Sequence, residues 1–125
     1  MQNDNARKTK EYRDMADAAT AVLDTNFLKA LSDPTRVQII KKLINMGACD
    51  ISTISQGLAQ DRSVISRHLA TLERASICAQ LKQGRHVLYD LDGPYIVGKV
   101  ERILDAIAPM AELCEPFGDI EKGVA

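Results

Sequence analysis

The sequence lacks the features that mark secreted, membrane-spanning and catalytic chains. No apolar run near the N-terminus has the form of a signal peptide, and no stretch is apolar over the length that a membrane span needs. There is no Gly-rich phosphate loop, no cluster of histidine and carboxylate residues, no internal repeat and no low-complexity segment. We therefore expect a cytoplasmic protein of one domain that is not an enzyme, has no cofactor and binds no membrane.

The sequence contains few cysteines, and its net charge is close to zero. The three cysteines, Cys49, Cys78 and Cys114, are odd in number and far apart, which argues against a disulfide framework and fits a reducing compartment. The formal net charge is -1, so the chain is not basic as a whole. Residues 61–86, however, carry five Arg or Lys residues against two acidic ones, a local charge of +3. This basic segment fits a nucleic-acid-binding face, and an ordinary solvated surface is the alternative.

The spacing of apolar residues predicts a flexible arm (1–11), a mainly helical domain (12–115) and a tail (116–125). The first helix of the domain is expected to run from Tyr12 to about Leu31, without Gly or Pro. The last is expected to begin beyond Pro94, to carry apolar residues as far as Met110 and to end near Cys114. Both carry more apolar surface than a small core needs, so they are candidates for a dimer interface.

The pattern of the inner part of the domain predicts three helices, the last two joined by a tight turn, followed by a hairpin. Each inner helix is expected to begin at an aspartate that can cap it: Asp33, Asp50 and Asp61. The third of these helices runs from Arg62 to near Ser76, and two strands follow at residues 77–81 and 87–91. Gln83-Gly84-Arg85 forms the connection between the strands, and the Gly favours a hairpin turn.

The helix that begins at Arg62 is the candidate recognition element. Ile65, Leu69 and Leu72 lie three or four residues apart and predict a buried face. The polar residues of its early turns are then free to read base edges in the major groove. They are Arg62, Ser63, Ser66, Arg67 and His68. Ser66 and His68 could instead cap locally or pack against the neighbouring helix. Lys82 and Arg85 lie near the hairpin tip, where DNA contact and plain surface charge are both possible.

Two motifs in the sequence form a specific pair. The first is LKALSDPTR at residues 28–36, and the second is VISRHLATLE at residues 64–73, followed by the Gly84-Arg85 hairpin. Together they resemble the motifs of the ArsR/SmtB family of repressors. The resemblance implies a winged helix-turn-helix of about five helices with a two-stranded β-hairpin wing. It also implies a homodimer formed by the first and last helices, and repression that a ligand or chemical change relieves. The operator would have two-fold symmetry, with half-sites about 34–36 Å apart.

The resemblance also locates the family's usual metal ligands, and this sequence lacks most of them. A Cys-x-Cys pair would fall at Gly47 and Cys49, so one thiol is missing. The ligands of the last helix would fall at Gly93, Tyr95, Ala106 and Pro109. Zinc needs about four N, S or O donors, so we expect no metal site of either type.

The remaining thiols leave the inducing signal open. We consider Cys49 and Cys114, which could act across subunits, as sensors of an oxidant, a sulfur species or trivalent arsenic. The alternative is that all three cysteines are structural, because a free Cys packs well as a small apolar residue. Two further alternatives are a DNA-binding regulator without an inducer and a helix-turn-helix used for protein contact.

Overall fold

The computed structural model describes residues 9–116, and residues 1–8 and 117–125 lie outside the described part. The described chain groups into two units, one formed by Asp24–Lys99 and the other by parts of residues 1–23 and 100–125. The first helix, α2 (Lys10–Ala21), belongs to the second unit. It begins within the expected arm 1–11. Most of the expected tail 116–125 lies outside the described residues.

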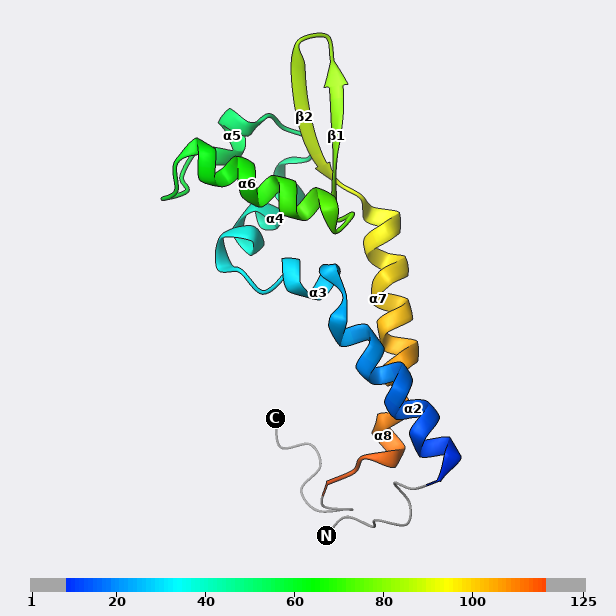
Figure 1. Cartoon of the computed structure of the whole chain (residues 1–125). Helices are drawn as coiled ribbons and strands as arrows, with labels where there is room; N and C mark the ends of the chain where they lie inside the picture. The colour runs from blue at the N-terminus through cyan, green and yellow to red at the C-terminus, as the bar shows by residue number, and fades with distance from the viewer. Residues whose placement is uncertain (1–8, 117–125) are drawn as a thin grey trace. The chain divides into compact units, whose positions relative to one another are not determined.

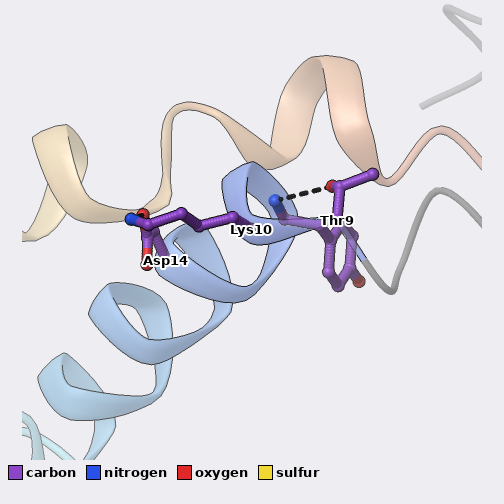
Figure 2. A network of polar contacts seen from close by, with 4 residues as sticks. Thr9, Lys10 and Asp14 are labelled. Atoms are coloured by element: carbon purple, nitrogen blue, oxygen red, sulfur yellow. Dashed lines mark hydrogen bonds and ion pairs between the residues drawn. The ribbon is translucent and has the colours of Figure 1, made fainter.

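A side-chain cap and an ion pair begin helix α2. The Thr9 hydroxyl accepts a hydrogen bond from the backbone N–H of Tyr12 over 3.1 Å, and Lys10 pairs with Asp14 over 2.8 Å (Figure 2). The cap satisfies one of the free N–H groups at the helix start. The ion pair is highly exposed and spaced i,i+4, so it contributes little to stability.

The prediction of one continuous helix from Tyr12 to Leu31 is wrong. Helix α2 ends at Ala21, the 3-10 turn η1 (Val22–Asp24) follows, and a new helix, α3 (Asn26–Ala30), begins. Thr25 causes the restart, because its backbone is extended and its hydroxyl accepts a hydrogen bond from the N–H of Leu28. An extended, capped residue of this kind marks the beginning of a helix.

The last helix is also divided. The prediction of one helix that ends near Cys114 is wrong, because helix α7 (Gly93–Ile107) ends at Ile107 and the short helix α8 (Met110–Leu113) follows. Pro109 lies between them and accounts for the break, since proline lacks an N–H group and clashes with the carbonyl four residues earlier. None of the described helices combines the length and the apolar character needed to cross a membrane.

The unit Asp24–Lys99 contains the predicted inner helices. They are α4 (Pro34–Met46), α5 (Ile51–Ser55) and α6 (Arg62–Arg74). Each predicted cap is confirmed: the Asp33, Asp50 and Asp61 carboxylates accept hydrogen bonds from backbone N–H groups of the following turn. These bonds also lower the pKa of all three carboxyls, so each remains charged near neutral pH.

The core of this unit is mostly aliphatic, and α6 contributes its centre. The predicted inward residues of α6, Ile65, Leu69 and Leu72, are fully buried, and each contributes about 1.5–3 kcal/mol to stability through burial. Four side chains from neighbouring segments share this core: Ile39, Leu43, Ile54 and Ile77. Because α6 buries one face so completely, its opposite face is directed to solvent.

The predicted hairpin is present in this unit. Strands β1 (Cys78–Gln83) and β2 (His86–Leu91) are antiparallel, with Gln83 opposite His86, and they extend beyond the helices (Figure 1). The turn therefore contains only Gly84 and Arg85, and the prediction that Gln83 lies in it is wrong. Gly84 has a φ of 62°, as expected for the first central residue of a type II′ turn.

Helix α6 ends in a Schellman motif that directs the chain into β1. The N–H of Ile77 donates to the carbonyl of Leu72, and that of Ser76 donates to the carbonyl of Glu73. Ser76 occupies the position that usually holds glycine, and its φ is 62°. This is the one non-glycine residue with positive φ among the described residues.

We expect Ser76→Gly to stabilise the protein by roughly 0.5–1 kcal/mol. The left-handed backbone costs an L-residue about 1–2 kcal/mol, which exceeds the extra chain entropy that glycine loses on folding, about 0.5–1 kcal/mol. Urea unfolding of the wild type and the variant measures the difference. Ser76→Ala, which keeps the Cβ atom, is the control and should show no gain. An equal gain in both variants would contradict this explanation.

Candidate nucleic-acid interface

The solvent-facing side of α6 carries four of the predicted DNA-contacting residues. Arg62, Ser63, Ser66 and Arg67 are all exposed, and they recur at the spacing of one helical face. They lie on the first two turns of the helix, on the side opposite its buried residues. A helix with polar side chains near its N-terminus and a firmly buried opposite face has the form of a recognition helix.

Two of these side chains also make contacts within the protein. Arg62 donates from Nη2 to the Ser52 hydroxyl of α5 over 2.6 Å, which ties the two helices together. The Ser63 hydroxyl donates to the Asp61 carboxylate over 2.9 Å. This bond uses the only proton of the Ser63 hydroxyl. In a contact with a base edge, the hydroxyl oxygen can therefore act only as a hydrogen-bond acceptor. Among the four, Ser66 and Arg67 are the residues whose side chains have no such contact within the described chain.

His68 is half-buried and contacts α4 rather than standing on the open face. Arg36 Nη1 lies 3.2 Å from His68 Nδ1. A guanidinium only donates hydrogen bonds, so Nδ1 accepts and the ring carries its proton on Nε2. The same guanidinium donates to the carbonyls of Ala30 and Lys29 at the end of α3. The Arg36 side chain thus links α3, α4 and α6, and this favours a packing role for His68.

The hairpin places two further predicted residues at its tip. Lys82 lies next to last in β1, Arg85 lies in the turn, and both are exposed. His86 follows at the start of β2 and is exposed as well. A two-stranded arm with cations at its end suits contact with DNA phosphates or the minor groove.

Two supporting contacts around the turn had no signal in the sequence. Lys42 of α4 donates from Nζ to the carbonyls of Thr53 and Gln56, which end α5. Cys49 pairs with Tyr89 of β2 through two backbone hydrogen bonds of 3.1 and 2.9 Å, so the segment before α5 is attached to the base of the hairpin. Both contacts fix the helix-turn-helix against its neighbours, and both join residues that are distant in sequence.

The three thiols differ in environment. Cys49 is buried, and burial together with the neighbouring Asp50 carboxylate raises its pKa, so the start of α5 does not activate it. Burial raises the pKa of Cys78 to about 12, as expected for a core residue. Cys114 is half-buried, and its sulfur lies 3.4 Å from the Tyr12 hydroxyl. Within residues 9–116, no group of three or more His, Cys, Asp or Glu residues is arranged to hold a metal ion.

Comparison with known proteins identifies the family. A family model described as bacterial regulatory protein, arsR family, matches residues 33–77, which include α4, α5 and α6. The arsenical resistance operon repressor of Escherichia coli K12 is 33% identical over 84 residues, which are 67% of this chain and 71% of the repressor. The chain belongs to the ArsR family. The transcriptional repressor PagR of Bacillus anthracis is 29% identical over 87 residues, 70% of this chain and 83% of PagR.

Solved structures agree with this assignment. An ArsR-like transcriptional regulator from Rhodococcus sp. RHA1 superposes with a TM-score of 0.61 at 24% identity, over 82% of this chain and 87% of that chain. The crystal structure of PagR gives a TM-score of 0.53 at 25% identity, over 70% and 94%. The protein is therefore a winged helix-turn-helix, DNA-binding transcriptional regulator of the ArsR repressor type and not an enzyme.

The Asp61 cap of α6 makes a pH-dependent contribution to stability. The pKa of Asp61 is lowered, first by the Ser63 hydroxyl and then by the N–H of Val64. A carboxylate of this kind stabilises the fold above its unfolded value of 3.8, and the contribution is lost as pH falls through the lower folded-state pKa.

We expect Asp61→Asn, which keeps a capping oxygen but does not titrate, to be less stable than the wild type at about pH 6. The difference should shrink towards zero as the pH falls below about 3.8. Urea unfolding over a pH series measures it. Asp61→Ala, which removes the cap at every pH, is the control. A deficit of Asp61→Asn that does not change with pH would contradict the role of the carboxylate charge.

Proposed function

We propose that the protein is a homodimeric repressor that binds a two-fold symmetric DNA operator in the cytoplasm and leaves it in response to a chemical signal. The observation that carries this proposal is the exposed polar face of α6. Three fully buried side chains on the opposite face fix the helix in the core. A rigid helix can enter the major groove without losing conformational entropy on binding. Family membership supports the same function.

Within this proposal the DNA contacts divide by type. Arg67 and Ser66 are the candidates for reading base edges, because they are exposed on α6 and are not held by other side chains. Arg62 and Ser63 contact nearby phosphates or bases from the helix start. Lys82 and Arg85 of the hairpin contact phosphate or the minor groove, and these contacts fix register more than they specify sequence. His68 supports the helix through Arg36 rather than contacting a base.

The proposed dimer rests on the apolar face of the last helices. Four large side chains at the end of α7 and the start of α8 are more than a third exposed: Val100, Leu104, Ile107 and Met110. Val100, Leu104 and Ile107 recur every three or four residues, so they form one stripe along α7, and Met110 follows at the start of α8. An apolar stripe of this kind marks an interaction surface, and a second copy of the chain supplies a matching one.

The same helix-turn-helix could in principle serve protein contact instead of DNA binding. The charge of the recognition segment argues against this, because Arg62, Arg67, Lys82 and Arg85 are all exposed. A face rich in cations fits a polyanion, and charged residues are depleted at the centre of protein interfaces. The salt dependence described below separates the two functions.

We further propose that, if the signal is thiol-based, Cys114 receives it rather than Cys49. Thiolates are the reactive form, and Cys49 is both buried and shifted to a higher pKa. Cys114 is more accessible and lies at the end of α8, beyond the proposed dimer stripe. A modification there is well placed to change the way in which two subunits pair.

We expect Arg67→Ala and Arg85→Ala each to weaken binding to the DNA upstream of the protein's own gene. Loss of a bidentate base contact costs about 1–3 kcal/mol, so Arg67→Ala should also relax sequence preference. Loss of a phosphate contact should lower the slope of log K against log salt by about 0.9, which is the result expected for Arg85→Ala. Gel-shift titrations at several salt concentrations measure both quantities.

Lys41→Ala is the matched control, because it removes one exposed cation of α4, outside α6 and the hairpin. It should leave the affinity and the salt slope nearly unchanged. Full affinity in both arginine variants would contradict the proposed interface. A wild-type affinity that does not vary with salt would favour the protein-contact function.

We expect Cys114→Ser to abolish release from DNA by oxidant, sulfide donor or arsenite, and Cys49→Ser to leave that release intact. In the folded wild type, iodoacetamide should label Cys114 much faster than Cys49, as mass spectrometry of peptides can measure. The reason is the greater accessibility of Cys114. Unchanged release in both serine variants would rule out a thiol signal.

A further inference from the structure

A small cavity between α3, α4 and α6 is lined by several side chains that can donate hydrogen bonds. Its volume is about 140 Å³. The lining residues are Asn26, Lys29, Ala30, Arg36, Thr71 and Arg74. Three of them are cations that come from three different helices, and none carries a carboxylate. A cavity with this lining favours a ligand that only accepts hydrogen bonds and carries negative charge.

Two of the cations are fixed in position by neighbouring groups. Arg36 makes its bonds to Ala30, Lys29 and His68, which still leaves one N–H on each terminal nitrogen. Arg74 donates from Nη2 to the Thr71 hydroxyl over 3.1 Å. Fixed donors do not lose side-chain entropy when a ligand binds, so the site is organised before binding.

The nearby carboxylates are engaged elsewhere. Asp33 accepts hydrogen bonds from the backbone N–H groups of Thr35 and Arg36, and Glu73 accepts one from the Gln80 side chain of β1. Within residues 9–116, no carboxylate forms an ion pair with Lys29, Arg36 or Arg74. In the described chain the three positive charges therefore have no carboxylate at ion-pair distance, and the charge of Arg36 acts on Asp33 only as a minor contribution to the lowered pKa of that carboxyl.

We propose that this cavity is a binding site for a tetrahedral oxyanion of the phosphate or sulfate class, held by Lys29, Arg36 and Arg74. Charge-assisted hydrogen bonds from guanidinium and ammonium groups are the usual means of holding such an anion. Asn26 also lines the cavity, and its side-chain amide can supply a neutral donor. The anion is either a backbone phosphate of bound DNA or a free ion, and the chemistry of the site is the same for both. The proposal does not depend on operator binding.

The direct test is a titration of the ¹⁵N-labelled full chain with inorganic phosphate and with sulfate, against chloride at equal ionic strength. We expect saturable shifts at the amides of Lys29, Thr71 and Arg74 with the two oxyanions and not with chloride. Lys29→Gln and Arg74→Gln should each weaken binding roughly tenfold or more, as expected for loss of one charge-assisted hydrogen bond. Lys41→Gln removes the same charge outside the cavity and should change nothing.

A second arm identifies the source of the anion. If the site holds a DNA phosphate, Lys29→Gln and Arg74→Gln should each lower the salt slope of DNA binding by about 0.9, and Lys41→Gln should not. If it holds a free ion, the slopes stay unchanged while the phosphate titration saturates. The proposal is overturned if the oxyanions give no saturable shifts and the slopes are also unchanged. The titration contains no DNA, so its failure is distinct from a failure of the proposed function.

Discussion

Burial of one face of α6 is the constraint on which the rest of the structure depends. Ile65, Leu69 and Leu72 have no solvent exposure, and together they fix both the position of the helix and its rotation about its own axis. Rotation by a fraction of a turn would expose these side chains and bury Ser66 and Arg67. The apolar stripe therefore determines which residues face DNA. The caps, the links from Arg36 and Arg62 and the Schellman motif at Ser76 all hold the helix in this orientation.

The features that sequence could predict are those with local causes. The aspartate caps at residues 33, 50 and 61, the period of α6 and the glycine turn of the hairpin each depend on a few neighbouring residues, and all of them are present. The two family motifs indicated a resemblance to known repressors, and the comparisons confirm that the chain belongs to their family. The exposed residues of α6 follow from its period, because knowledge of the buried face defines the open one.

The features that sequence could not predict come from weak local signals or from long-range contacts. Thr25 is one of many polar residues near the first helix, and only its extended backbone shows that it starts α3. The roles of Arg36 and Lys42 depend on carbonyl groups that other helices bring close. The pairing of Cys49 with Tyr89 spans 40 residues, and the Cys49 thiol, considered as a sensor from the sequence, is buried. The pocket at Lys29 and Arg74 arises in the same way, from three separate helices.

The most direct measurement of the central claim is a hydroxyl-radical footprint, combined with methylation interference, on the DNA upstream of the gene. Two copies of α6 should protect two half-sites related by two-fold symmetry, with centres about one helical turn, or 34–36 Å, apart. Methylation of guanine N7 in the major groove should block binding within both half-sites. A single protected half-site, or protection without interference in the major groove, would contradict the claim that a pair of α6 helices reads the operator.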